Sequence, residues 1–236
     1  MSKTAFAVPV LPGKDAKSIP AIFSGRSDDY AESRSKHGVT MERVYEQSTP
    51  MGTFAVAYVE STDDFGATLG SMAASDLPID REFLGGLKDV HGLDLSGPAG
   101  EPPEVLGDWR DDAITQRKRG FAFCAPIRPD ATEKGRAFSK EAFETRRDEH
   151  GASRRALGLN QETVVLNHTP HGDILCVYLE GDDPVQANRR FAESKSEYDT
   201  WFKDQCKEIF PPEIDFNEPV PPVTQIFDSQ EALVAR

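Results

Sequence analysis

Hydrophobic and polar residues follow the same succession of patterns twice along the chain. In the first copy, a short apolar segment at 5–11 precedes a charged helical region at 15–37, which ends at Gly38. Two apolar segments at 42–49 and 53–60 then flank Pro-Met-Gly, in which proline presets one backbone angle and glycine supplies a positive one. These signals predict a strand, a helix and a β-hairpin.

The second copy repeats this order. An apolar segment at 121–127 leads into a helical region at 131–157, and Gly158 stands where a helix-ending glycine is expected. The strands at 162–169 and 173–180 flank Pro-His-Gly. The second copy therefore predicts the same strand, helix and hairpin.

A second helical region follows each hairpin. Its apolar residues recur at a spacing that buries one stripe of a helix; they are Phe83, Leu87 and Val90 in the first copy and Phe202, Cys206 and Ile209 in the second. The short segments 92–95 and 213–216 are then expected to close each sheet as its edge strand. The resulting order β-α-β-β-α-β predicts a ferredoxin-like unit with helices on one face of an antiparallel sheet.

Residue identities between the copies support an internal duplication. Placing 28–60 over 148–180 at a constant offset of 120, without a gap, gives eleven identical positions. They are Asp28, Ser33, Arg34, Gly38, Glu42, Val44, Thr49, Pro50, Gly52, Tyr58 and Glu60 with their counterparts Asp148, Ser153, Arg154, Gly158, Glu162, Val164, Thr169, Pro170, Gly172, Tyr178 and Glu180.

We therefore expect an α+β fold of two ferredoxin-like repeats. The first spans 1–97, a Gly/Pro-rich linker spans 98–118, the second repeat spans 119–217, and a Pro-rich tail spans 218–236. One repeat leaves a face of its sheet bare, and two repeats packed through these faces would form a single-chain pseudo-dimeric α+β barrel. Internal pairing of this kind predicts a monomer or a weak homodimer.

The duplicated pattern, from Phe6 to about Phe216, resembles the dimeric α+β barrel superfamily. The segment 37–60 and its counterpart are similar to actinobacterial members of unassigned function. The resemblance implies a ligand pocket between the sheet and its helices. It leaves the activity open, because the superfamily includes cofactor-independent monooxygenases, cyclases, isomerases, haem-binding proteins and non-catalytic stress proteins.

Composition narrows the range of partners. The formal net charge of −13 is spread along the 236 residues, and an acidic surface repels nucleic acid and anionic lipids, so we expect neither nucleic acid nor a membrane as a partner. No segment approaches the ~18 apolar residues of a membrane span. Three widely spaced cysteines among apolar neighbours indicate reduced core residues in a cytoplasmic protein.

Two arginines shared by the copies lie near the end of the first helical region. The structural interpretation is that Arg34 and Arg154 pair with carboxylates such as Glu42 and Glu162. The functional interpretation makes Arg154 an anion-stabilising group and assigns ligand binding to Arg34 and to Tyr30, one helical turn before it.

Shared polar residues also occur in the second strand of each hairpin. Tyr58 precedes Glu60 by two positions, as Tyr178 precedes Glu180, so each pair shares one face of its strand. Such a pair is a candidate for ligand binding or acid–base chemistry, with Tyr178 as an orienting donor. The alternative is a core tyrosine whose hydroxyl is satisfied.

Histidines distinguish the copies. His150, His168 and His171 stand where the first copy has Tyr, Ser and Met. Histidine titrates near neutrality, so His150, one turn before Arg154, is a candidate general base or acid, or alternatively a partly exposed helix residue. His168 is a candidate ligand-binding residue, and the His-x-x-His spacing is a weak metal signal without a third ligand, so we expect no metal.

These residues lead to three functional hypotheses. The preferred one is an enzyme without a bound cofactor that transfers a proton on a small hydrophobic, enolisable or phenolic molecule, as a cyclase, isomerase or monooxygenase does. His150, Arg154 and Tyr178 would carry the reaction. The alternatives are a haem-binding protein with a histidine such as His150 as axial ligand, and a non-catalytic binding or stress-related module.

Overall fold

A computed structural model describes residues 1–95 and 101–234 of the chain. The chain divides into two compact units, Met1–Pro102 with Thr224–Arg236, and Pro103–Val223. In the described part of the chain, no helix is both long enough and apolar enough to cross a membrane.

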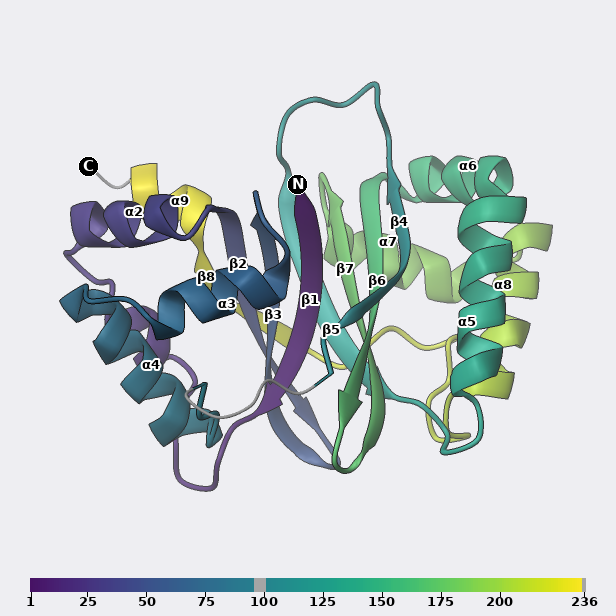
Figure 1. The fold of residues 1–236 in the computed structure, drawn as a ribbon. Helices are drawn as coiled ribbons and strands as arrows, with labels where there is room; N and C mark the ends of the chain where they lie inside the picture. Colours follow the sequence, from purple (N-terminus) through teal and green to yellow (C-terminus); the bar gives the residue numbers. More distant parts are fainter. Residues whose placement is uncertain (96–100, 235–236) are drawn as a thin grey trace. The chain divides into compact units, whose positions relative to one another are not determined.

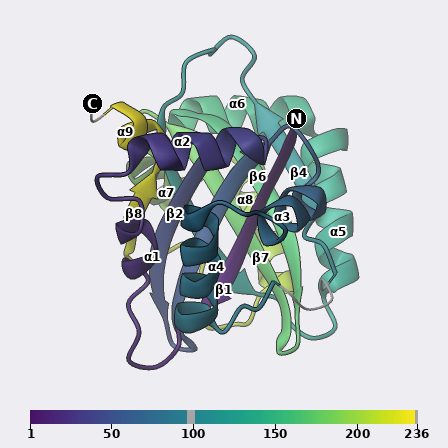
Figure 2. The ribbon, with the colours of Figure 1, turned by 60° about the vertical axis from the view of Figure 1, so that its left-hand side comes forward.

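The first unit contains a four-stranded sheet in the order β1-β3-β2-β8, with helices on one of its faces (Figure 2). Its elements are β1 (Ser2–Pro9), α1 (Ser18–Ala21), α2 (Ser27–Lys36), β2 (Val39–Thr49), β3 (Gly52–Ser61), α3 (Phe65–Ala73), α4 (Pro78–His91), β8 (Val223–Asp228) and α9 (Ser229–Val234). Both β1 and β2 pair antiparallel with β3.

The second unit contains a four-stranded sheet in the order β4-β6-β7-β5, also with helices on one face (Figure 1). Its elements are β4 (Glu104–Arg110), β5 (Arg119–Pro126), α5 (Thr132–Lys140), a π-helix η1 (Glu141–Thr145), α6 (Arg147–Leu157), β6 (Leu159–Thr169), β7 (Gly172–Gly181), α7 (Pro184–Glu193) and α8 (Glu197–Ile209). The predicted α+β class with antiparallel sheets in two ferredoxin-like repeats is confirmed.

The local turn signals are also confirmed. Thr49 pairs with Gly52, and Thr169 with Gly172, at the ends of the two predicted hairpins. Gly38 and Gly158 have φ values of +68° and +85°, a left-handed conformation that glycine adopts without a steric penalty. Each of these glycines therefore ends a helix and directs the chain into the next strand.

The predicted final strand of each repeat is wrong. In 92–95, Gly92 ends α4 in a left-handed conformation, and no residue of this segment joins a sheet. In 213–216, Asp215 accepts a hydrogen bond from the backbone N–H of Asn217 at 2.8 Å, which forms a local turn in place of a strand. The fourth strand of each sheet comes from elsewhere in the chain.

The two repeats exchange their last strands. β4 follows the first repeat in sequence but pairs antiparallel with β6 of the second, and β8 follows the second repeat but lies beside β2 of the first. The segment 98–118, expected to be a linker, thus contains β4, while residues 98–100 of it lie outside the described residues. The expected tail, 218–236, likewise supplies β8 and α9.

Each exchanged strand delivers one aromatic ring to the helices of its unit. Trp109 of β4 packs edge-on against His150, with ring centroids 6.0 Å apart. Phe227 of β8 packs against Tyr30 in the same way at 5.5 Å. Gly107 of β4 permits a close approach, because an added Cβ would lie only 2.3 Å from the ring of Phe143.

A buried ion pair attaches β8 to the first unit. Arg43 Nε donates to Asp228 Oδ2 at 2.7 Å, and both side chains are almost wholly buried. We expect Asp228→Ala to destabilise the protein by about 3–5 kcal/mol, because it leaves the guanidinium without its carboxylate. Urea unfolding followed by circular dichroism measures this change.

The exposed pair between Lys36 and Asp76 provides the control. Asp76→Ala should leave stability nearly unchanged, because water solvates both charges. If the two substitutions had equal effects, β8 would not be held by its buried charge.

A candidate active-site cavity in the second repeat

A buried polar network connects strand and helices in both repeats. In the first, Arg34 of α2 donates from Nε to Glu42 of β2 at 2.9 Å and from Nη1 to Ser33 at 3.1 Å. Ser33 and Ser75 each donate to Asp80, in the first turn of α4, at 2.5 Å. These residues, Glu42–Arg34–Ser33–Asp80–Ser75, join three elements of the unit through side chains alone.

The second repeat builds the same network from the equivalent residues. Arg154 of α6 donates to Glu162 of β6 and, at 3.1 Å, to Ser153. Ser153 and Ser194 donate to Asp199 of α8 at 2.5 and 2.6 Å. The predicted pairing of the arginines with Glu42 and Glu162 is therefore present in both units.

Asp199 shows how the network holds a buried charge. Burial by itself raises the pKa of this carboxyl group, but hydrogen bonds from Ser153, Ser194 and Ser196 and the charge of Arg154 outweigh it, and the pKa lies below its ordinary value. Asp80 has a lowered pKa for the same kind of reason. Both carboxylates therefore stay ionised at neutral pH, with serine hydroxyls in place of water.

Aromatic rings surround each arginine differently. The guanidinium of Arg34 lies 4.8–4.9 Å from the centroids of three rings, those of Phe23, Tyr30 and Phe83. The guanidinium of Arg154 lies over two rings, Phe191 at 5.2 Å and Phe202 at 4.7 Å. Of these two, Phe202 is equivalent to Phe83, whereas Phe191 stands where the first repeat has Met72. His150 replaces Tyr30, and Phe143, at the position of Phe23, packs against His150 with centroids 4.4 Å apart.

A cavity of about 90 Å³ lies beside Arg154 and Glu162, between the sheet of the second unit and its helices. This volume is well above the roughly 10–15 Å³ that one water molecule needs. The wall is largely aliphatic and aromatic; it includes Phe123, Phe138, Phe143, Leu157, Leu159, Val164, Leu175, Val177, Leu179, Phe191, Phe202, Cys206, Phe210, Phe216 and Val220. Its polar members are Arg154, Glu162, Ser139, Asn188 and Glu218.

The segment after α8 closes one side of this cavity. Phe216, Glu218 and Val220 belong to the wall, and the backbone N–H of Val220 donates to Asn188 Oδ1 of α7 at 2.9 Å. The predicted position of a pocket, between sheet and helices within one repeat, therefore matches a cavity in the second unit.

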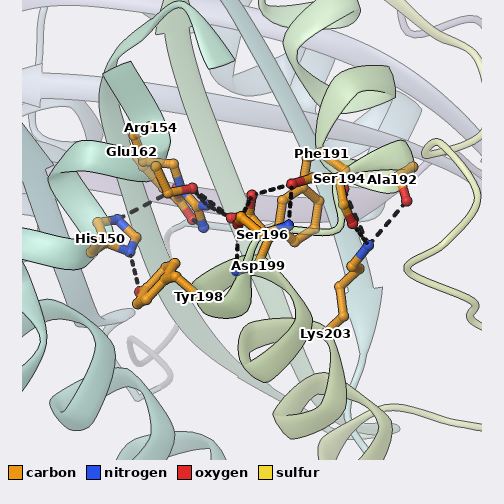
Figure 3. Close-up of polar contacts among 11 residues, drawn as sticks. His150, Arg154, Glu162, Phe191, Ala192, Ser194, Ser196, Tyr198, Asp199 and Lys203 are labelled. Atoms are coloured by element: carbon orange, nitrogen blue, oxygen red, sulfur yellow. Dashed lines mark hydrogen bonds and ion pairs between the residues drawn. The ribbon is translucent and has the colours of Figure 1, made fainter. Parts of the chain in front are cut away.

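His150 lies behind the cavity wall and does not line it. Its ring is fully buried, Nδ1 is 2.9 Å from the hydroxyl of Tyr198, and Nε2 is 3.6 Å from Glu162 Oε2 (Figure 3). Burial, with the charges of Arg154 and Arg147, lowers the pKa of His150 to about 2. The imidazole is therefore neutral at pH 7, and the alternative of a partly exposed helix histidine is wrong.

The tyrosine and glutamate pairs on the strands lie away from the cavity. Alternate residues of β7, Leu175, Val177 and Leu179, form the cavity wall, so Tyr178 and Glu180 lie on the opposite face of the sheet. Tyr178 donates to Glu180 at 2.9 Å, and Tyr58 donates to Glu60 at 2.7 Å in the first unit. The structure thus does not bring Tyr178 together with His150 and Arg154.

The remaining predicted site residues are also separate from the cavity. Tyr30 donates to Glu42 at 3.1 Å within the aromatic cluster of the first unit. His168 contacts Asp173 at 2.8 Å across the hairpin, while His171 at the turn is exposed. Among residues 1–95 and 101–234, no group of three potential metal-ligating side chains gathers.

The donor set of the cavity does not fit haem. No histidine is among the residues that line it. Cys206 does line it, but burial raises the pKa of its thiol well above the ordinary value, which disfavours the thiolate that binds iron. The described cavity therefore offers no axial ligand of the usual kind.

Sequence reasoning missed two residues of this region. The sequence predicts Glu162 only as a partner of Arg154, although the identical residue in the first copy, Glu42, indicates that the position has a shared role. Tyr198 stands one residue before Asp199, where the first copy has Ile79 before Asp80, so alignment of the copies would have revealed it. Both side chains contact the groups already singled out.

Comparisons with known proteins identify the fold. No protein-family model and no curated protein sequence matches the chain. Among solved structures, an "anthrone oxidase-like protein" is similar with a TM-score of 0.53 and 10% identity, covering 99% of this chain and 95% of that one. A "putative monooxygenase" from Fusobacterium nucleatum has a TM-score of 0.49 and 13% identity, covering 96% and 92%; one from Lactobacillus acidophilus has 0.46 and 10%, with the same coverage. The first similarity shows a shared fold.

The neutral His150 predicts a pH dependence of stability. Between the folded pKa of about 2 and the unfolded value of about 6.5, the unfolded chain binds a proton that the folded chain does not. The free energy of unfolding should therefore fall as the pH falls, by about 2 kcal/mol between pH 7 and pH 5 from this residue.

Urea unfolding of the wild type and of His150→Gln at both pH values measures this contribution. All other titrating groups are common to the two proteins, so the smaller loss in the variant reports His150 alone. Equal losses in both proteins would contradict a neutral, buried imidazole.

Proposed function

We propose that the cavity of the second repeat binds a small hydrophobic molecule with an acidic C–H or O–H group, and that the chain oxidises it with molecular oxygen in a monooxygenase-like reaction without a bound cofactor. The observation that carries this proposal is the Arg154–Glu162 pair in an otherwise largely apolar wall. Apolar pockets with a few convergent polar groups are the usual form of small-molecule sites.

The two charged residues have complementary roles. Glu162 accepts the proton, and Arg154 stabilises the enolate or phenolate that remains. Charge interactions of this kind are stronger in a water-excluded cavity than in solution. Because Arg154 cannot be deprotonated in a protein, it keeps its positive charge throughout the reaction.

The proposal changes two of the roles expected from sequence. Proton removal moves from His150 to Glu162, because Glu162 lines the cavity and His150 does not. Tyr178 has no role, because it lies on the other face of the sheet. Arg154 keeps the anion-stabilising role.

The name of one similar structure suggests a substrate class. An anthrone carries a methylene group between two aromatic rings, and its anion is electron-rich enough to reduce oxygen directly. In the balanced reaction the methylene carbon loses two hydrogens and gains one oxygen atom as a carbonyl, while the second oxygen atom leaves as water. The substrate supplies all the electrons, so no external reductant is needed.

Glu162→Gln tests the proposed base, and Glu42→Gln is its matched control. The two substitutions change equivalent buried Arg–Glu pairs, one in each repeat, and of the two glutamates it is Glu162 that lines the cavity. We expect Glu162→Gln to reduce turnover by about 10²–10⁴-fold, as removal of a general base does, and Glu42→Gln to leave turnover within a few-fold of wild type. Oxygen consumption with 1-naphthol or anthrone, without added metal, haem or flavin, provides the measurement.

Probe binding and oxygen dependence complete this test. Binding of 1-naphthol should exceed that of naphthalene, which has the same apolar rings but no acidic hydroxyl. If product continued to form without oxygen, this result would contradict the oxidation and indicate an isomerase or cyclase reaction. If Glu162→Gln and Glu42→Gln had equal effects on turnover, the reaction would not take place in the cavity.

A further inference from the structure

Two differences between the repeats occur together beside the buried glutamate. Where the first repeat has Tyr30 and Ile79, the second has His150 and Tyr198. In the first repeat the hydroxyl of Tyr30 bonds directly to Glu42 at 3.1 Å, and Ile79 is an apolar core residue. In the second repeat, the imidazole of His150 stands in place of the Tyr30 hydroxyl, and the hydroxyl of Tyr198 stands in place of the apolar side chain of Ile79.

These replacements create a chain of three polar groups. Glu162 Oε2 is 3.6 Å from His150 Nε2, and His150 Nδ1 is 2.9 Å from the hydroxyl of Tyr198 (Figure 3). Nε2 has no hydrogen-bond partner among the described residues, although the ring is fully buried. A buried ring nitrogen without a hydrogen bond lowers stability, and a catalytic role is one explanation for its presence.

The chain begins at the cavity and ends near the surface. Glu162 lines the cavity, whereas Tyr198 lines a separate groove formed by α6, α7 and the start of α8. The groove wall includes Glu149, Ser153 and Glu193, which are polar. The side chains of His150 and Tyr198 thus lie between a largely apolar cavity and a groove that has charged and hydroxyl side chains in its wall.

We propose that His150 and Tyr198 relay protons between Glu162 and the groove, so that the carboxylate is restored after each turnover. This inference rests on the proposed function, in which Glu162 takes a proton from the substrate. Neither residue touches the cavity, so both act through Glu162. In the first repeat, Tyr30 leads to no equivalent relay because the next position is Ile79.

Each step of the relay transfers one proton. After Glu162 takes the substrate proton, it passes a proton to His150 Nε2, the proton on Nδ1 passes to the oxygen of Tyr198, and the hydroxyl proton of Tyr198 leaves to water in the groove. The same steps run in reverse when the oxygenated intermediate takes up a proton to lose water, so the reaction releases no net proton and His150 returns to its starting tautomer. Nε2 must approach Glu162 by about 0.4 Å or more to reach hydrogen-bond distance. His150 and Tyr198 are neutral before and after each pass, which suits a ring that burial and the charges of Arg154 and Arg147 keep from becoming an imidazolium.

Tyr198→Phe tests the relay, because it removes one hydroxyl and retains the aromatic ring. The first readout needs no substrate: the exchange of the ring N–H of His150 with solvent, followed by NMR of protein with ¹⁵N-labelled histidine. We expect this exchange to slow at least tenfold in Tyr198→Phe. The ring N–H signal of His150 is assigned by its loss in His150→Gln.

His37 is the internal control. It is a buried histidine of the first unit whose two ring nitrogens contact Ser71 at 2.7 Å and Asp80 at 2.8 Å. Its exchange should be the same in wild type and Tyr198→Phe, which also shows that the variant is folded. Unchanged exchange at His150 would overturn the relay, whether or not any probe is turned over.

The second readout is steady-state turnover of 1-naphthol or anthrone. Tyr198→Phe should lower kcat at least tenfold and leave KM unchanged, because binding in the cavity does not involve Tyr198. Slowed exchange with unchanged kcat would show a path that the reaction does not use and would overturn the inference. Slowed exchange in a protein that turns over no probe would support the relay and reject the proposed reaction.

Discussion

The buried pairing of arginine with glutamate constrains the rest of each repeat. Burying a guanidinium and a carboxylate under a helix layer is costly unless each has its partner and further polar groups bond the atoms that remain. Ser33 and Asp80, or Ser153 and Asp199, meet this need and connect the first helical region to α4 or α8. Three of the eleven identities between 28–60 and 148–180, Ser33, Arg34 and Glu42, belong to this network, and Ser75 and Asp80 recur as Ser194 and Asp199.

The two repeats differ in what surrounds this constant network. Around Arg34, three aromatic rings cover the guanidinium. In the second repeat, the π-helix η1 carries Phe143 to His150 instead, and a cavity lies beside Arg154. A π-helix inside an α-helical segment commonly marks a functional site. The two copies therefore bury the same arginine in different surroundings: three rings cover Arg34, whereas two rings and a cavity lie beside Arg154.

Local signals made part of this structure predictable from sequence. Hairpin turns and helix-ending glycines depend on neighbouring residues, and they were found where expected. The positions of β4 and β8 depend on pairing across long stretches of chain, which a local pattern does not encode. The face of β7 that carries Tyr178 was not predictable, because Ile174 and Cys176 make that face as apolar as the one that carries Leu175, Val177 and Leu179. The separation of His150 from the cavity depends on the orientation of its ring, which spacing on a helix does not give.

The exchange of strands has a consequence for synthesis of the chain. Arg43 and Asp228 are 185 positions apart, so the first sheet acquires its last strand only after residues 223–228 have left the ribosome. Until then the outer edge of β2 carries unpaired backbone groups, which are a template for association between nascent chains. Contacts this distant in sequence also form slowly. The first sheet of this protein is therefore completed only after the second repeat has been made, and its exposure to chaperones depends on how quickly that repeat is synthesised.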